Sequence, residues 1–165
     1  MNLFDPETIG DDVMRTSFRA VLPSFMLFAV PYALPDFTGT WSFDPAKSGI
    51  EEYGNQPAIT LDIQHTGNNL HIMRSMLFQG KPVTWEFSYI LDGREHTLVS
   101  SGGNLKYKAV WNGNTLVISG TLATSKRQIP QTLSYSLSAD GKVLTVTESI
   151  GSQGEAASKQ IFIRK

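Results

Sequence analysis

Arg74 is the residue that could most directly hold a ligand by its charge. It shares one face of a predicted strand with three apolar residues, Leu70, Ile72 and Met76. If this face points inward, the guanidinium would pair with an anionic head group or with a carboxylate such as Glu148, because an uncompensated buried charge is costly. The opposite face carries His71, Met73, Ser75 and Leu77. If that face points inward instead, Arg74 is solvated, and the sequence leaves both arrangements open.

Two histidines, His65 and His71, flank a predicted turn at Gly67–Asn69. If the turn centres on Asn68, the two imidazoles form a direct cross-strand pair, close enough to share a metal ion. The spacing supplies no third ligand, and His96 belongs to a different predicted hairpin. We therefore expect no metal site, and we interpret the pair as surface or strand-end imidazoles.

Aromatic residues recur on the predicted inward faces of several strands: Trp85, Tyr89, Tyr107, Trp111 and Tyr135. They could line a cavity for an apolar ligand, or they could form a packed core without a cavity. The predicted ligand-binding residues are Arg74, Trp85, Tyr89, Tyr107 and Tyr135.

Enzymatic sites receive little support from the sequence. The chain has no cysteine, which excludes thiolate catalysis, disulfides and cysteine-type zinc sites. It has no Gly-x-Ser-x-Gly motif and no glycine-rich phosphate loop between a strand and a helix. The acids and bases that could serve a small-barrel isomerase or cyclase are Glu86, His96 and Glu148. We predict a non-enzymatic protein without a cofactor.

The charge balance also limits the possible partners. Lys and Arg number 14 against 15 Asp and Glu, and no basic patch with interleaved aromatic residues is visible. We therefore expect no nucleic-acid partner. The predicted partner is a small apolar ligand, and we expect a monomer.

The elements that must position these residues are strands. Alternating apolar and polar residues predict ten short strands: Phe37–Phe43, Ala58–Thr66, Leu70–Phe78, Val83–Leu91, Arg94–Ser101, Leu105–Asn112, Thr115–Ala123, Gln131–Ser138, Lys142–Ile150 and Ala157–Lys165. Three hairpin dipeptides join successive strands: Asp92-Gly93, Asn112-Gly113 and Asp140-Gly141. No connection is long enough for a parallel crossover. The pattern predicts an all-β fold, an antiparallel up-and-down meander barrel of eight to ten strands, because closure removes exposed sheet edges.

An N-terminal extension, residues 1–33, precedes the predicted barrel domain, residues 34–165. Within it, residues 14–33 have the features of a secretory signal peptide. Met14–Arg19 is basic, Ala20–Leu34 is an uncharged apolar run, and Ala33 could precede a cleavage site. The run is shorter than the roughly 20 residues of a membrane span.

This segment predicts a secreted or periplasmic protein whose translation begins at Met14. The alternative is a helix that caps the barrel or lies on a membrane surface. Membrane contact would then be transient and would involve only residues 14–33, if they are not cleaved.

The first predicted strand carries a motif. Phe37-x-Gly39-x-Trp41 resembles the start of the calycins, which comprise the lipocalins and the fatty-acid-binding proteins. The longer Gly-Thr-Trp form ends in Lys47-Ser48, and further matches lie at Trp111–Leu116 and Leu137–Val146. Together they resemble a group of uncharacterised bacterial lipocalin-like proteins, many with signal peptides. The resemblance covers residues 37–165 and implies a meander barrel.

The resemblance also implies roles for particular residues. In lipocalins an arginine late in the barrel packs over the first-strand tryptophan, and Arg164 could do this for Trp41, with Gly39 as the third structural residue. Fatty-acid-binding proteins hold a carboxylate with an Arg-x-Tyr pair on the last strand, where this chain has Gln160-x-Phe162. They also place two helices after the first strand, and Gly49–Gln56 is too short and glycine-rich for them.

The leading functional hypothesis is therefore non-enzymatic binding of a small hydrophobic ligand inside a lipocalin-like barrel. One alternative is a structural or protein-interaction barrel with a packed interior, and another is the isomerase or cyclase. We interpret Phe37–Ser48 as a closure device, in which Trp41 plugs one barrel end and the first strand pairs with Ala157–Lys165 to remove both sheet edges.

Overall fold

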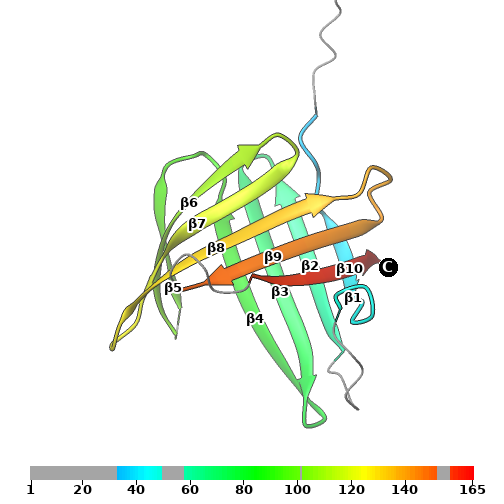
Figure 1. Ribbon diagram of the computed structural model, residues 1–165, viewed down its shortest axis with the longest axis horizontal. Coiled ribbons are helices and arrows are strands. Elements are labelled where there is room, and N and C mark those ends of the chain that lie inside the picture. The colour runs from blue at the N-terminus through cyan, green and yellow to red at the C-terminus, as the bar shows by residue number, and fades with distance from the viewer. Residues whose placement is uncertain (1–32, 50–57, 101, 152–156) are drawn as a thin grey trace, which may run out of the picture. The chain divides into compact units, whose positions relative to one another are not determined.

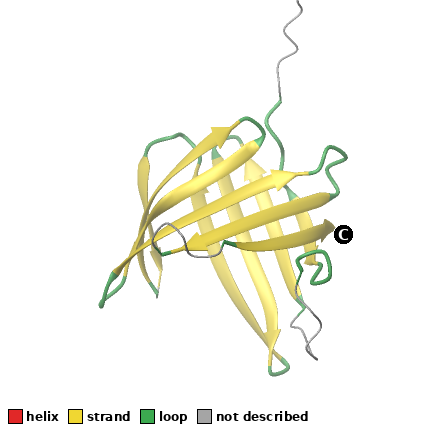
Figure 2. Ribbon diagram, in the orientation of Figure 1, coloured by secondary structure: helices red, strands yellow, loops and turns green. Residues whose placement is uncertain are grey.

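A computed structural model describes residues 33–49, 58–100, 102–151 and 157–165. The predicted signal-peptide segment lies outside the described residues except for Ala33, and the connection Gly49–Gln56 does so except for Gly49. Figure 2 shows strands and loops in the described part, where no helix is long and apolar enough to span a membrane.

Ten strands form one antiparallel sheet, which confirms the predicted all-β meander. The strands are β1 (Gly39–Phe43), β2 (Ile59–Thr66), β3 (Asn69–Phe78), β4 (Lys81–Ile90), β5 (Glu95–Ser100), β6 (Gly103–Asn112), β7 (Thr115–Ala123), β8 (Gln128–Leu137), β9 (Val143–Ile150) and β10 (Ser158–Arg164). Their order in the sheet is β4-β3-β2-β1-β10-β9-β8-β7-β6-β5. In Figure 1, β6–β10 cross in front of β1–β4, so the sheet curls round on itself into a nearly closed barrel.

The first and last strands pair as predicted, with Trp41 opposite Arg164 and Phe43 opposite Phe162. The predicted removal of both sheet edges is nevertheless wrong, because β4 and β5 are the two edges of the sheet.

The gap between β4 and β5 lies at the Asp92-Gly93 connection. These two residues do not make the predicted two-residue hairpin, and the Asp92 carboxylate accepts a hydrogen bond from the Arg94 backbone N–H at 2.9 Å. Across the gap, the Ile90 backbone N–H donates to the Tyr107 hydroxyl at 2.9 Å. A side chain thus replaces one ladder hydrogen bond at this edge.

The register of β2 and β3 corrects the proposed histidine pair. Thr66 pairs with Asn69, so Gly67 and Asn68 alone make the turn, and His65 lies opposite Leu70 while His71 lies opposite Gln64. A shift of one residue moves a side chain to the other face of a strand. The two imidazoles therefore lie on opposite faces, and they cannot share a metal ion.

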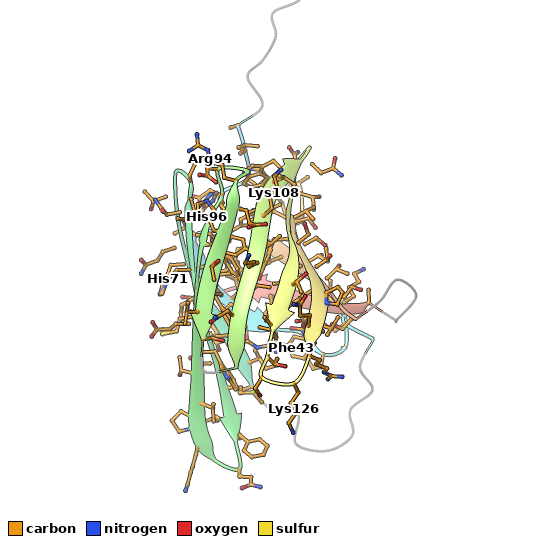
Figure 3. The ribbon with its side chains drawn as sticks, turned by 90° about the vertical axis from the view of Figure 1, so that its left-hand side faces the viewer. Phe43, His71, Arg94, His96, Lys108 and Lys126 are labelled. Carbon is orange, nitrogen blue, oxygen red and sulfur yellow. The ribbon has the colours of Figure 1, made fainter. Side chains whose placement is uncertain are left out.

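One apolar core fills the barrel, built from the inward residues of the strands and from Phe37 and Leu91. We call the end with the Gly67-Asn68 and Gly113 turns the closed end, and the end with the Gln79-Gly80 turn the open end. Figure 3 shows Arg94 and His96 towards the closed end and Lys126 towards the open end. The core differs between these ends, and that difference defines the candidate site.

Candidate functional site

The closed end is packed with aromatic rings. Phe37 and Trp41 have no exposed surface. The Phe37 ring stacks on Trp111 with centroids 5.7 Å apart and lies 5.8 Å from the His65 ring. The Trp41 indole N–H donates to the Phe37 carbonyl at 3.0 Å. This aromatic cluster leaves the indole fully satisfied and dry.

Arg164 covers the Trp41 ring at this end. Its Cζ lies 4.2 Å from the ring centroid, and it donates to the Thr38 carbonyl at 2.6 Å and to the Gly141 carbonyl at 2.9 Å. Gly39 permits this approach, because a Cβ there would lie 2.6 Å from Arg164 Nη1 and its φ is +144°. The three residues proposed as structural, Gly39, Trp41 and Arg164, therefore lie together, and Arg164 packs against both of the others.

A cavity of about 90 Å³ lies farther along the barrel axis, beyond Trp41. Its apolar walls come from Leu61, Ile72, Phe87, Leu133, Val146 and Phe162. Its polar lining comes from Arg74, Tyr89, Gln131, Tyr135, Glu148 and Gln160. Of the two arrangements open for Arg74, the structure therefore has the inward one, on the face shared with buried Leu70 and Ile72.

Most polar groups of this cavity lack a protein partner. Gln131 Nε2 donates to Glu148 Oε1 at 3.1 Å. Arg74 and the hydroxyls of Tyr89 and Tyr135 make no hydrogen bond to another described residue, and no described acid forms an ion pair with Arg74. No side-chain nitrogen or oxygen in the described part is both fully buried and unpartnered. These groups therefore reach the open volume of the cavity.

The two phenols stay neutral over a wide pH range. Burial raises the pKa of both Tyr89 and Tyr135 well above the usual value, and the nearby charge of Glu148 raises each pKa further. The positive charge of Arg74, which lines the same cavity, acts in the opposite direction on the pKa of Tyr135. The cavity thus holds one cation, one anion and two neutral hydroxyl donors.

The inward faces of the strands continue past the cavity to an apolar mouth at the open end. Phe78, Trp85 and Ile150 lie on these faces by strand alternation, and their exposed fractions are 58%, 42% and 48%. Trp85 pairs with Arg74 across β3 and β4. It therefore lies at the mouth, next to the cavity, and does not line it.

Tyr107, another proposed ligand residue, is also outside the cavity lining. Its hydroxyl accepts the Ile90 backbone N–H, and its ring meets Tyr89 edge-on with centroids 5.2 Å apart. It bridges the gap between the sheet edges and supports the Tyr89 wall. Of the five proposed ligand residues, Arg74, Tyr89 and Tyr135 line the cavity together.

The remaining acids and bases lie elsewhere. Glu86 is exposed on the outer face of β4, and His96 Nε2 lies 2.8 Å from Asp92 Oδ1 near the gap. A larger open hollow of about 470 Å³ runs beside the gap, but its histidines are already engaged, His96 with Asp92 and His71 with Ser88 at 3.0 Å. Within the described ranges no three His, Asp or Glu side chains are grouped to hold a metal. Of the three candidate acids and bases, Glu86, His96 and Glu148, it is Glu148 that lines the cavity.

Two glutamines, Gln131 and Gln160, line the cavity although neither is among the predicted ligand-binding residues. Gln160 and Phe162 both line the cavity, at the positions compared above with the Arg-x-Tyr pair. Gln131 was not singled out. Its signal was its place on one face of β8 with Leu133 and Tyr135, which alternation could have supplied.

Comparisons with solved structures identify the fold. Secretory abundant heat soluble protein 4 from Ramazzottius varieornatus matches with a TM-score of 0.55 and 18% identity, over 78% of this chain and 94% of that one. The REP1-NXSQ fatty acid transporter matches with a TM-score of 0.55 and 15% identity, over 79% and 96%. Apo lipid binding protein 8 from Caenorhabditis elegans gives 0.56 and 11%, over 78% and 95%.

These likenesses give the chain the fold of the fatty-acid-binding-protein and lipocalin-type barrels. No protein-family model matches the chain, and no curated protein matches its sequence. The narrower resemblance to bacterial lipocalin-like proteins stays a prediction.

Proposed function

We propose that the barrel binds a small, mainly apolar molecule in its interior without transforming it. The observation that carries this proposal is the cavity itself, where Arg74, Tyr89 and Tyr135 present polar atoms without a described partner. Unmade hydrogen bonds inside a protein are costly, so a site that retains several of them is suited to a ligand that completes them.

The size of the cavity indicates how such a ligand would lie. At about 90 Å³, it is smaller than the roughly 150 Å³ engineered cavity that holds a benzene. The polar end of the ligand would occupy the cavity, and its apolar part would extend along the barrel to the mouth at Phe78, Trp85 and Ile150. Apolar burial at about 25 cal/mol per Å² would stabilise that part.

The fold also supports binding of an apolar ligand inside the barrel, since a fatty acid transporter and a lipid binding protein share this fold. The device that would hold a fatty acid on the last strand is missing, because Gln160 and Phe162 supply neither a cation nor a hydroxyl at the cavity. Any charge contact would come from Arg74 on β3 instead.

Titration with an environment-sensitive apolar naphthalene dye tests the proposal. The wild-type protein is expected to enhance the dye's fluorescence, and Val146→Phe, which fills the cavity, is expected to weaken binding at least tenfold. Thr145→Phe is the matched control, because Thr145 lies on the outer face of the same strand. Circular dichroism checks that both variants fold. Equal dye binding by all three proteins, or none by the wild type, would refute interior binding.

We also propose that the barrel domain is exported. The basic Met14–Arg19 stretch followed by an uncharged apolar run supports this. Intact-mass measurement of the protein isolated from its native cells provides the test. A mass that lacks residues up to Ala33 is expected, whereas a product that retains residues 14–33 contradicts export.

A further inference from the structure

The charges facing the cavity can define the chemical class of its ligand. We propose that the cavity selects a head group of zero net charge that offers a hydrogen-bond acceptor to Arg74 and a donor to Glu148, such as a carboxamide or an amino-acid zwitterion. A simple carboxylate is the disfavoured head group. This inference rests on the proposed function and concerns the same cavity.

The first step is the charge balance. Arg74 supplies one positive and Glu148 one negative charge to the lining, and the two phenols are neutral. No ion pair within 4.0 Å joins Arg74 to Glu148 in the described part of the chain. An anionic head group would satisfy Arg74 but would add a second negative charge beside Glu148, in a volume too small to hold many water molecules. A neutral head group adds no such charge.

The second step is hydrogen-bonding capacity. A guanidinium offers five N–H donors, and a carboxylate offers about four acceptor sites. Gln131 Nε2 uses one acceptor site of Glu148, at 3.1 Å. The contact also fixes the carboxylate on the cavity wall and leaves its other sites for a donor. A carboxylate ligand has no hydrogen to donate to it, whereas an amide N–H₂ or an ammonium has.

The third step is the rest of the lining. The hydroxyls of Tyr89 and Tyr135, each on a side chain less than a tenth exposed, can both donate and accept. Gln160 adds an amide with the same versatility. Each of these groups can serve a neutral polar head group as well as an anionic one, so none of them excludes either class. Arg74 and Glu148 therefore determine the selectivity, and Glu148 is the element that rejects a carboxylate.

Calorimetric titration with three ligands of equal chain length tests this. Octanamide and 2-aminooctanoic acid represent the two neutral head groups, and octanoate represents the carboxylate. At neutral pH the wild-type protein is expected to bind octanamide or the amino acid at least tenfold more tightly than octanoate. Glu148→Gln keeps the side-chain shape and is expected to reduce that preference at least tenfold by strengthening octanoate binding. Arg74→Gln is expected to weaken the binding of all three ligands.

Glu86→Gln is the matched control, because it removes the same charge from the outer face of β4. It should leave the preference unchanged. Octanoate binding in the wild type that is as tight as the binding of both neutral ligands, or an unchanged preference in Glu148→Gln, overturns the inference while leaving interior binding intact. If none of the three ligands binds while the naphthalene dye still binds inside the barrel, the inference about the head group is also overturned, but the proposed function is not. Failure of the dye as well removes the proposed function itself.

Discussion

Two arginines on the same barrel occupy opposite situations. Arg164 stacks on Trp41 and donates to two backbone carbonyls, whereas Arg74 has no described hydrogen-bond partner and faces a cavity. The first holds the closed end together, and the second raises the polarity of the interior without a compensating contact. One region of the core is therefore organised for folding, whereas the other keeps polar groups that lack a described protein partner.

The same contrast extends to the surrounding residues. At the closed end the indole N–H of Trp41 is bonded and the rings of Phe37 and Trp111 are stacked. In the cavity, the hydroxyls of two buried phenols make no hydrogen bond to another described residue. Substitutions at the closed end should therefore reduce stability, while substitutions in the cavity should change binding with little loss of stability. The following predictions test that division.

Truncation of the closed-end tryptophan should have the largest effect. Trp41→Ala removes a fully buried indole, and large-to-small changes of this kind cost about 3–5 kcal/mol. Trp85→Ala is the control, because Trp85 is 42% exposed at the mouth and its loss should cost about 1 kcal/mol. Urea unfolding measures both free energies. Equal losses would show that the two ends do not differ.

The two arginines provide the next comparison. Arg164→Met should lower the free energy of unfolding by about 2–3 kcal/mol, because charge-assisted hydrogen bonds and a cation–π contact are lost. Arg74→Met should leave the stability unchanged or raise it by about 1 kcal/mol, because an apolar group replaces an unpaired charge. Thermal and urea unfolding test this. A larger loss for Arg74→Met would mean that Arg74 has a structural role.

Two glycines separate a close contact from backbone strain. Gly39→Ala and Gly67→Ala both place a Cβ where φ is positive, but only at Gly39 does the new carbon meet Arg164 Nη1, at 2.6 Å. Gly67 has nothing within 4 Å. We expect Gly39→Ala to cost about 1–2 kcal/mol more than Gly67→Ala. If unfolding measurements give equal costs, Arg164 can move away from Gly39 freely, and the closed end is less rigid than the structure indicates.

The sequence predicted this division only in part. Alternation and glycine dipeptides predicted the strands, and the opening motif indicated that Trp41 and Arg164 meet, because both signals are local or carried by a resemblance. The orientation of Arg74 could not be predicted, since both faces of β3 carry apolar residues. Trp85 was expected to face inward. Alternation predicts which face of a strand a residue lies on but not its height along the barrel axis. The position of Trp85 at the mouth could therefore not be predicted.

The two errors of register have a common origin. The turn at Gly67-Asn68 is one residue shorter than the proposed Gly67–Asn69 turn, and this placed His65 and His71 on opposite faces. The Asp92-Gly93 signal is a hairpin dipeptide, yet the Asp92 side chain bonds Arg94 and His96 instead. Turn length distinguishes the first case and side-chain hydrogen bonding the second, and the hydrophobic pattern encodes neither of them.

The smallest expected effect is an alkaline loss of stability that originates in the cavity. Burial raises the pKa of Tyr135 in the folded protein. In the unfolded chain a tyrosine has a pKa of about 10. Above that pH the unfolded chain binds fewer protons than the folded one, so stability is retained below pH 10 and falls as the pH rises. At pH 11 the loss from this one residue should be about 1 kcal/mol.

Tyr135→Phe isolates this contribution, since it removes one phenol and leaves the other ionisable side chains in place. The free energies of unfolding of the two proteins should differ little at pH 8, because the Tyr135 hydroxyl has no described hydrogen-bond partner to lose, and the difference should change by about 1 kcal/mol in favour of Tyr135→Phe at pH 11. A ligand that occupies the cavity should add to wild-type stability at both pH values by mass action. A difference that does not depend on pH would mean that the Tyr135 hydroxyl is in contact with water, and the cavity would then be an open channel rather than an enclosed binding site.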